Sequence, residues 1–330
     1  MPRRLSPIFS TAKRWRSRSS CRTRSSPRPT LPTATPRSAA DYPHPRHGGP
    51  PPCLILPDVR KEEYPMATEP VFSNALPDLV VVSGTASGLG TNIARLLTES
   101  GVRTIGVDLA PAPESLASER YSHVRGDVTD EATWAGITDM ITRENPGTLG
   151  LVTSAAMLNV GTILEFDKAA MERTMSVNFI GTALAFRAML PLMTARGGGP
   201  IVAVASIDAT FAEQQLAVYA ASKGAVRQLT RTVAMDHARQ GIRANVLSPG
   251  PMLAGLFERH MKSANDPDRF LAARANRQPA GRILDPAEVA RAGLFLLSDA
   301  STALNGAEII ADGGLTTSFD FRTGSEGASV

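Results

Sequence analysis

The sequence of 330 residues has only two cysteines, Cys21 and Cys53, and both precede residue 66. The rest of the chain therefore has no disulfide framework, no cysteine-ligated metal and no cysteine nucleophile. The five histidines show no ligand spacing such as His-Glu-x-x-His, so we expect no catalytic metal. No uninterrupted apolar run reaches the ~18 residues of a membrane-spanning helix, so we expect no membrane partner.

An excess of positive charge is confined to the start of the chain. Residues 1–65 hold 13 Lys and Arg against 4 Asp and Glu, whereas residues 66–330 hold 22 against 27. The net charge of +4 therefore comes from the first segment and does not indicate that the remainder binds nucleic acid. The hydrophobic content of 42% and charged content of 20% are typical of a globular protein.

Residues 1–65 are rich in Arg, Ser and Pro, which predicts a disordered basic leader. Three interpretations remain open: an organelle transit peptide, a basic tail for an anionic partner, or upstream sequence absent from the mature protein, with Met66 as the true start. Frequent proline argues against an amphipathic targeting helix, and Met66 stands just before the first expected strand. We favour the third interpretation and expect a cytoplasmic protein.

From Leu79 onward, short apolar runs alternate with segments of helical periodicity. The expected strands are Leu79–Ser83, Val102–Val107, Leu149–Ser154, Ile201–Ser206, Ile242–Leu247 and Glu308–Ala311. The expected helices are Thr91–Ser100, Glu131–Glu144, Asp167–Thr194, Leu216–Gln240 and Pro286–Ser298. The alternation predicts that residues 66–330 form one α/β domain: a single Rossmann-type, doubly wound parallel sheet with helices on both faces.

A glycine-rich turn follows the first expected strand. It comprises Ser83, Gly84, Thr85, Ala86, Ser87, Gly88, Leu89 and Gly90, and a helix comes next. Glycine allows a sharp turn and a close approach to a ligand, and the positive N-terminus of a helix suits a pyrophosphate. The alternative is a turn that only connects a strand to a helix.

Asp108 ends the second expected strand, 18 residues beyond Gly90. A carboxylate there accepts hydrogen bonds from the ribose hydroxyls of a dinucleotide and repels a 2′-phosphate. No Arg or Lys lies in Thr85–Leu89 or directly after Asp108, which favours NAD over NADP. The alternative role for Asp108 is a loop cap. Asp127 is a candidate for binding the adenine amino group, or a turn-forming residue.

Tyr219 and Lys223 share one face of an expected helix, because they are four residues apart. A nearby ammonium favours the phenolate, so we expect a lowered Tyr219 pKa that suits proton transfer. Ser206 ends a strand thirteen residues earlier, where ligands bind in open α/β sheets. The alternatives are a tyrosine packed in the core, a lysine that extends to water, and a serine that caps a helix or turn.

In this order and spacing, these residues resemble the short-chain dehydrogenase/reductase family over about Leu79 to Gly314. Further matching segments are Val177–Gly181, Asn245–Pro251, Gly281-Arg282 and Asp312–Gly314. The resemblance implies that Tyr219 is the general acid/base, that Lys223 holds the nicotinamide ribose, and that Ser206 polarises the substrate oxygen. It also implies that Asn178 holds a water linked to Lys223. The cofactor-binding set that it implies adds Val128, Ser154, Ala155, Pro249, Gly250 and Met252 to Gly84, Ser87, Gly88, Leu89 and Gly90 of the turn and to Asp108, Asp127, Tyr219 and Lys223.

Three positions depart from the family pattern. Thr153-Ser154-Ala155-Ala156 stands where Asn-Asn-Ala-Gly is usual, which puts cofactor affinity or stability in doubt. Ser83 replaces a common threonine but keeps the hydroxyl. Ala254 stands where a threonine often contacts the carboxamide of the nicotinamide.

These features predict hydride transfer between NAD and a secondary alcohol or its ketone, with Tyr219 moving the proton. The alternatives are an NADPH-dependent ketone or 3-oxoacyl-thioester reductase and a non-catalytic dinucleotide-binding scaffold. Apolar residues among charges predict a substrate lid over about 252–279. The tail Phe319–Arg322 is a candidate to reach the site or a neighbouring subunit. The resemblance implies a homotetramer or homodimer.

Overall fold

The computed structural model describes residues 74–317; the predicted leader boundary and the tail Phe319–Arg322 lie outside the described residues. Seven described strands form one parallel sheet in the order β3-β2-β1-β4-β5-β6-β7. Their bounds are β1 Leu79–Ser83, β2 Arg103–Asp108, β3 Tyr121–Arg125, β4 Leu149–Thr153, β5 Gly199–Val204, β6 Ile242–Pro249 and β7 Glu308–Ala311.

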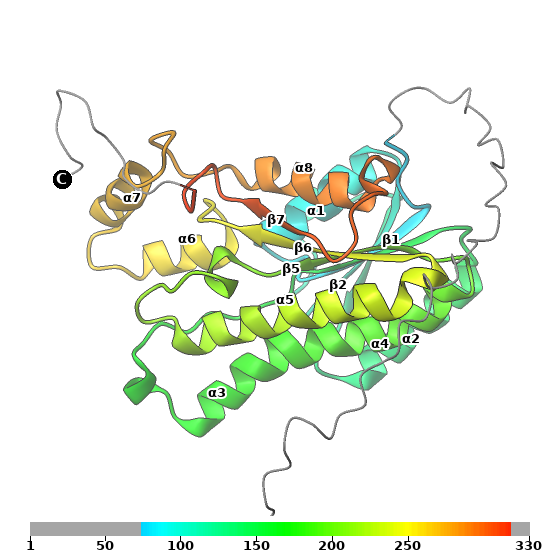
Figure 1. Ribbon diagram of the computed structural model, residues 1–330, viewed down its shortest axis with the longest axis horizontal. Coiled ribbons are helices and arrows are strands. Elements are labelled where there is room, and N and C mark those ends of the chain that lie inside the picture. Colours follow the sequence, from blue (N-terminus) through cyan, green and yellow to red (C-terminus); the bar gives the residue numbers. More distant parts are fainter. Residues whose placement is uncertain (1–73, 318–330) are drawn as a thin grey trace, which may run out of the picture. The chain divides into compact units, whose positions relative to one another are not determined.

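Helices cover both faces of this sheet. Helices α1 and α8 lie on one face, and α2, α4 and α5 lie on the other (Figure 1). The bounds are α1 Gly88–Glu99, α2 Glu131–Glu144, α3 Lys168–Met175, a π-helical turn Ser176–Ile180, α4 Gly181–Thr194, α5 Ala217–His237, α6 Gly255–Lys262, α7 Pro267–Asn276 and α8 Pro286–Leu297. Short 3-10 turns occupy Glu114–Leu116, Ile163–Glu165, Ile207–Ala209, Ala238–Gln240 and Asp299–Ser301. The predicted Rossmann-type fold class is confirmed.

The strands form where apolar side chains are continuous. Every residue of β1 and β4 is buried, as expected for strands covered by helices on both faces. Strand β3 was not predicted, because its sequence Tyr-Ser-His-Val-Arg contains one aliphatic residue and therefore no apolar run. It lies at the edge of the sheet and pairs only with β2 among the described strands, so its side chains are only partly covered.

The predicted helix Asp167–Thr194 is interrupted by the π-helical turn. By length and composition, Lys168–Thr194 is apolar enough to cross a membrane. However, its residues Phe186, Met189 and Met193 belong to the core that covers the sheet. The apolar composition of this stretch is therefore used, at least on its inner face, in packing against the strands.

Helix α8 begins as the sequence indicated. Asp285 caps it by accepting a hydrogen bond from Ala287 N at 2.7 Å, and Glu288 accepts one from Asp285 N at 2.9 Å. Pro286 is the first helical residue, where a missing N–H is harmless.

The direction of strand addition reverses between β1 and β4. In an open parallel sheet, a crevice forms beyond the carboxyl ends of the strands at such a point. The segments that follow β1, β2, β4, β5 and β6 all border one cavity of about 510 Å³.

Candidate active site

The glycine turn forms one wall of the cavity and requires its first glycine. Gly84 has a φ of +77°, and a Cβ there would lie 2.6 Å from Ala155 N. Ser83 Oγ accepts hydrogen bonds from Ser154 N at 3.1 Å and Ala155 N at 3.2 Å, so it holds the turn against the end of β4. The expectation that serine suffices in place of threonine agrees with these two bonds.

The N-terminus of α1 has the features of an anion-binding site. Ser87 is the N-cap residue but makes no side-chain cap hydrogen bond, and the first turn contains no acid. The first backbone N–H groups of the helix therefore lack a side-chain acceptor of their own. Ser87, Gly88 and Leu89 border the cavity. A pyrophosphate fits these donors, because it brings negative charge to the positive end of the helix dipole.

Most predicted site residues border this cavity, but two do not. Gly90 is buried in the first turn of α1, where a Cβ would strike the carbonyl of Gly84, so close packing requires a glycine there and its cofactor role stays a prediction. Asn178 also lies off the cavity wall. The predicted residues on the wall are Gly84, Ser87, Gly88, Leu89, Asp108, Asp127, Val128, Ser154, Ala155, Ser206, Tyr219, Lys223, Pro249, Gly250 and Met252.

Asp108 accepts hydrogen bonds from Ala86 N and Ala110 N, each at 3.0 Å. It therefore caps the turn, which was the alternative interpretation, while still bordering the cavity. Sequence reasoning missed Arg125, which stands opposite Asp108 in the register of β2 and β3 and donates to Leu109 O at 3.0 Å. The sequence could not place Arg125 beside Asp108, because strand β3, which carries Arg125, was not predicted.

Asp127 and Val128 follow β3 at the cavity wall. Asp127 Oδ1 accepts from the backbone N and the hydroxyl of Thr129, both at 2.8 Å, so it forms a turn. The carbonyl of Val128 accepts from Trp134 Nε1 at 2.8 Å, which anchors the segment to α2. This wall of the adenosine side is therefore fixed by bonds made within the chain.

Ser206, Tyr219 and Lys223 meet beyond the end of β5. Their side chains are buried, with residue exposures of 7%, 9% and 2%, and all three border the cavity. Lys223 Nζ donates to Val204 O at 2.8 Å and lies 5.8 Å from the centroid of the Tyr219 ring. Ser206 also caps the turn Ile207–Ala209 by accepting from Asp208 N at 3.2 Å.

The expected lowering of the Tyr219 pKa is wrong for the protein in this state. Burial raises the pKa of Tyr219 above its ordinary value, and the negative charge of Asp208 raises it further, although hydrogen bonding with Ser206 lowers it. Burial also lowers the pKa of Lys223 to about 8. Loss of hydration is the largest cause at both groups, and Tyr219 is a neutral phenol at pH 7.

Asp208 is a site residue that sequence reasoning missed. Its Oδ2 accepts from Ser206 Oγ at 3.1 Å, and it borders the cavity. Burial and the nearby Glu213 raise its pKa to about 6, while hydrogen bonding with Ser206 and the charge of Arg274 oppose that rise. Its position two residues after the strand-end serine was the available signal.

Asn178 is buried in the π-helical turn and faces the helix that carries the tyrosine. Its amide donates to Met157 O at 3.0 Å and to Ser222 Oγ at 2.9 Å, while its oxygen accepts from Met157 N at 2.8 Å. Ser222 in turn donates to Tyr219 O at 2.6 Å. Asn178 therefore positions α5 directly, and its role in holding a water stays a prediction.

The departures from the family pattern have distinct surroundings. Thr153 Oγ1 is buried at the end of β4 and has no hydrogen-bond partner within residues 74–317. Ala254 borders the cavity as the N-cap residue of α6 and provides no side-chain cap. Neither side chain makes a hydrogen bond within the described residues, and of the two positions Ala254 borders the cavity.

Comparison with known proteins identifies the family. The family described as Enoyl-(Acyl carrier protein) reductase matches residues 84–316, most of the described chain. The chain belongs to the short-chain dehydrogenase/reductase family. It is similar to cis-4-hydroxycyclohexanecarboxylate dehydrogenase from Sinomonas cyclohexanicum, with 37% identity over 72% of this chain and 96% of that protein.

Two solved structures of short-chain dehydrogenases/reductases are similar as well. The ligand-free aldohexose dehydrogenase of Thermoplasma acidophilum has a TM-score of 0.70 and 26% identity, over 77% of this chain and all of that one. A gluconate 5-dehydrogenase from Burkholderia cenocepacia J2315, in complex with NADP and tartrate, has a TM-score of 0.66 and 30% identity, over 73% and 95% of the two chains.

The predicted lid of this short-chain dehydrogenase/reductase consists of α6 and α7. Phe270 on α7 packs against Phe257 and His260 on α6, with ring centroids 5.8 and 5.1 Å apart. Arg274 on α7 pairs with Glu213 at 2.5 Å, across the substrate end of the cavity. Among the described residues, this is the only ion pair between α6–α7 and the rest of the domain.

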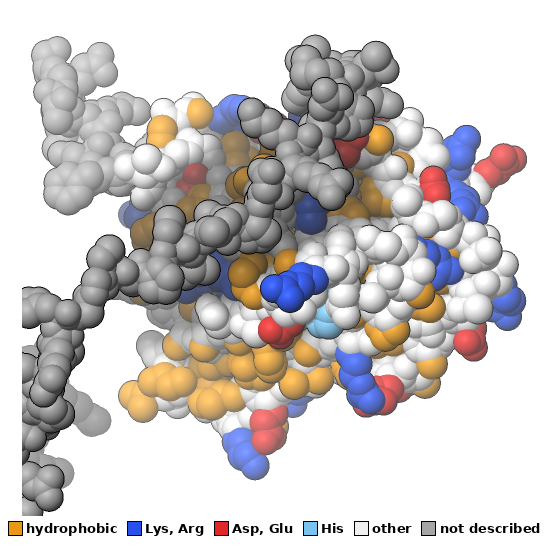
Figure 2. Space-filling model, turned by 45° about the vertical axis from the view of Figure 1, so that its right-hand side comes forward, with side chains coloured by type: hydrophobic (Ala, Val, Ile, Leu, Met, Phe, Trp, Pro, Cys, Tyr) orange, Lys and Arg blue, Asp and Glu red, His pale blue; other side chains and the backbone are white. Residues whose placement is uncertain are grey.

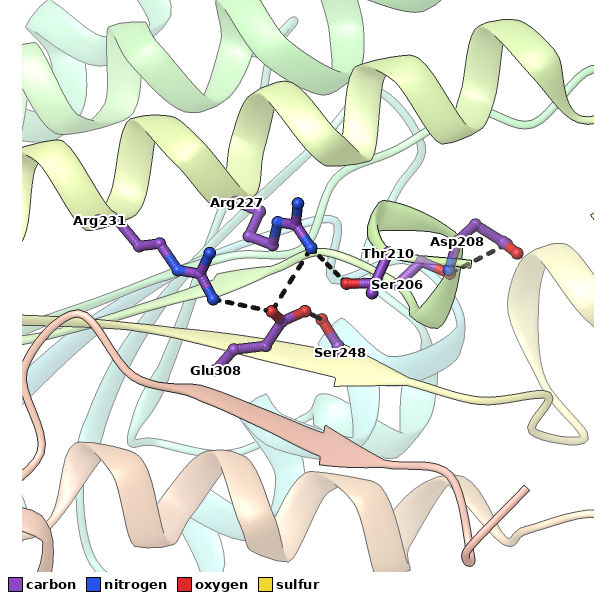
Figure 3. Close-up of polar contacts among 7 residues, drawn as sticks. All are labelled: Ser206, Asp208, Thr210, Arg227, Arg231, Ser248 and Glu308. Atoms are coloured by element: carbon purple, nitrogen blue, oxygen red, sulfur yellow. Dashed lines mark hydrogen bonds and ion pairs between the residues drawn. The ribbon is translucent and has the colours of Figure 1, made fainter. Parts of the chain in front are cut away.

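A polar network lies behind the strand-end serine (Figure 3). Glu308 on β7 accepts from Ser248 Oγ at 2.7 Å and from Arg231 at 3.1 Å, and it lies 3.8 Å from Arg227. Arg227 also donates to Thr210, just after the Ser206 turn. The network therefore joins the segment after β5 to the end of β6, and so connects two walls of the cavity.

Proposed function

We propose that this protein transfers a hydride between a secondary alcohol, or its ketone, and NAD, with Tyr219 as the general acid/base. The proposal rests on one observation: Ser206, Tyr219 and Lys223 are buried together on the same cavity that the glycine turn borders. The name of the Sinomonas relative, which describes oxidation of a hydroxyl-bearing ring, supports this reaction class.

The bound nicotinamide supplies the hydride acceptor or donor. Ser206 has one hydroxyl proton, which it donates to Asp208 Oδ2 when no ligand is bound. With the substrate bound, this hydroxyl turns to the reacting oxygen, donates its hydrogen bond there and so stabilises the charge that develops. Tyr219 gives a proton to this oxygen in reduction and accepts it in oxidation. Lys223 holds positive charge beside the phenol, and Asp108 binds the ribose hydroxyls. Because the Tyr219 pKa is raised in the absence of ligands, the tyrosine begins reduction in its proton-donating form.

Tyr219→Phe tests the acid/base role. We expect kcat to fall by about 10²–10⁴, because a positioned proton donor contributes that much, while the Kd for NAD measured by calorimetry stays nearly constant. Tyr121→Phe is the control for kcat: its phenol bonds Thr85 at 2.9 Å behind the glycine turn and does not border the cavity, so its loss should leave the proton transfer intact. Unchanged turnover by Tyr219→Phe would refute the role. NAD binding without turnover of any alcohol by the wild type would instead indicate a non-catalytic scaffold.

The preference for NAD is tested with Asp108→Asn. We expect the wild type to favour NAD over NADP in kcat/KM by about tenfold or more, and the variant to lose most of this preference, because the carboxylate repels the 2′-phosphate. The nearby Arg125 is the cation that would favour the phosphate. A wild type that prefers NADPH would establish the ketone or 3-oxoacyl-thioester reductase in place of the NAD enzyme.

We further propose a cytoplasmic homodimer or homotetramer without nucleic-acid or membrane partners. On the face in Figure 2, acidic and basic side chains are intermixed, and apolar side chains gather in its lower part. Ile180 beside α4 and Met235 on α5 are 43% and 61% exposed, and apolar side chains of this kind favour subunit packing. Light scattering and sequencing of the mature N-terminus test these points.

A further inference from the structure

The substrate end of the cavity has a wall of charged side chains. Asp208 lies on the turn after β5, Glu213 lies between this turn and α5, and Arg274 comes from the lid. The apolar Leu256 and Phe257 of α6 border the same cavity. A ligand there therefore meets both ionised groups and an aromatic surface.

The carboxylate of Asp208 has unused hydrogen-bonding capacity. Ser206 Oγ donates to its Oδ2 at 3.1 Å, and within residues 74–317 the carboxylate has no other hydrogen bond or ion pair. A carboxylate has about four acceptor positions, and a partly buried one is costly unless donors fill them. Because Asp208 borders the cavity, a ligand can supply the missing donor.

The surrounding charges decide what kind of donor fits. Glu213 and Arg274 form an ion pair at 2.5 Å, so the guanidinium is already neutralised. Burial and Arg274 lower the pKa of His260, which is therefore uncharged at pH 7. Lys223 is turned to Val204 O, 2.8 Å away, and Tyr219 is neutral. Asp208, Glu213 and Arg274 together carry a net charge of −1, so an anionic substituent beside Asp208 would be repelled, whereas a hydroxyl adds no charge and donates a hydrogen bond.

We propose that Asp208 is a specificity-determining residue that accepts a hydrogen bond from a hydroxyl on the carbon next to the one that reacts. The inference rests on the proposed function, in which Ser206 binds the reacting oxygen. Asp208 Oδ2 lies one hydrogen-bond length from Ser206 Oγ, and neighbouring hydroxyls of a gauche diol are separated by about the same length. The substrate class is a polyol or sugar-like alcohol, with its C–H surface against Phe257.

The test compares matched alcohols that differ by one hydroxyl. Values of kcat/KM are measured for cis-1,2-cyclohexanediol against cyclohexanol, and for 2,3-butanediol against 2-butanol, with both NAD and NADP. We expect the wild type to prefer the diols by tenfold or more, because a site built for a hydroxyl discriminates against its absence. Asp208→Leu should reduce this ratio to near one, and Asp208→Asn, which keeps the shape, should reduce it several-fold.

The ratio of kcat/KM for a diol to kcat/KM for its mono-alcohol separates an effect on substrate specificity from an effect on catalysis. Any general loss caused by disturbing Ser206 lowers the rates of the diol and the mono-alcohol alike and leaves their ratio unchanged. Asp139→Asn on the exposed side of α2 is the control and should keep the wild-type ratio. If the wild type oxidises both alcohols of a pair equally, or if both Asp208 variants keep its ratio, the inference fails while the proposed function stands. No turnover of either pair with either cofactor would overturn both.

A third substrate distinguishes a hydroxyl from an anionic group. cis-4-Hydroxycyclohexanecarboxylate is expected to be a poorer substrate than cis-1,2-cyclohexanediol. If the hydroxy acid is preferred, and Arg274→Gln removes that preference, then Arg274 rather than Asp208 determines the substrate class and the inference is wrong.

Discussion

Lys223 is 2% exposed, and in the described part of the chain its amine has one hydrogen-bond partner, the carbonyl of Val204. Burial lowers its pKa to about 8, so the charge that suits catalysis opposes folding at neutral pH. Between about pH 8 and its ordinary pKa, the unfolded chain binds more protons than the folded one. The contribution of this group to stability therefore rises with pH across that range.

We expect Lys223→Met to be more stable than the wild type at pH 7, by roughly 1–3 kcal/mol, and inactive. The difference should shrink as the pH rises above 8, because the wild-type lysine then loses its charge. Urea denaturation at pH 7 and pH 9.5 measures both effects. Lys168→Met, at a side chain that is 87% exposed, is the control. A Lys223→Met variant that is less stable at pH 7 would contradict this account.

Thr153 is a second buried polar residue, and its hydroxyl has no hydrogen-bond partner among the residues that the structure describes. Thr153→Val keeps the shape and removes the unsatisfied group, so the free energy of unfolding should rise by about 1 kcal/mol. Thr230→Val is the matched control, because the Thr230 hydroxyl donates to Val226 O at 2.8 Å and its loss should destabilise the protein. A destabilised Thr153→Val would show that the hydroxyl has a partner in solution.

The lid and the glycine turn approach each other closely through their backbones, and Arg259 on α6 also donates to Ser87 Oγ at 3.3 Å. Gly255 begins α6 with a φ of +58°, and a Cβ there would lie 3.0 Å from the Cα of Gly88. Gly88 has a φ of +67°, so neither position accepts a side chain without strain. The first turn of the lid therefore lies against the residues that we assign to the pyrophosphate.

Gly255→Ala should move α6 away from this turn and weaken NAD binding about five- to tenfold, since strain of this kind costs about 1 kcal/mol or more. Calorimetry measures the change in Kd. Gly136→Ala on α2 is the control, because nothing lies within 4 Å of its added methyl group. Equal NAD affinity in the Gly255→Ala variant would indicate that the lid does not contribute to cofactor binding.

Sequence alone predicted the elements whose periodicity is unbroken. The bounds of β1, α2 and β7 agree with the prediction to the residue. Strand β3 was missed because an edge strand lacks a continuous apolar signal, and the π-helical turn was missed because one added residue hardly alters the spacing of apolar side chains.

At the scale of the molecule, the fold class could be predicted from the alternation of strands and helices. The residues of the cavity wall that we assign to the cofactor could be predicted because they follow strands whose carboxyl ends meet at one edge of the sheet. What sequence could not predict depends on side chains brought together by packing. The raised Tyr219 pKa results from burial, Arg125 was brought beside Asp108 by an unrecognised strand, and the pair of Glu213 with Arg274 joins residues far apart in the chain.

The π-helical turn at Ser176–Ile180 sets the rotational phase of everything that follows it. One residue corresponds to about 100° of helix rotation, so the added residue lets a single segment serve two sets of neighbours. Helix α3, before the turn, contacts α5, and α4, after it, contacts α2 and the sheet. The number of residues between Lys168 and Thr194 is thus fixed by geometry. A substitution there disturbs one contact, whereas a single-residue deletion would turn one half of the segment away from its partners.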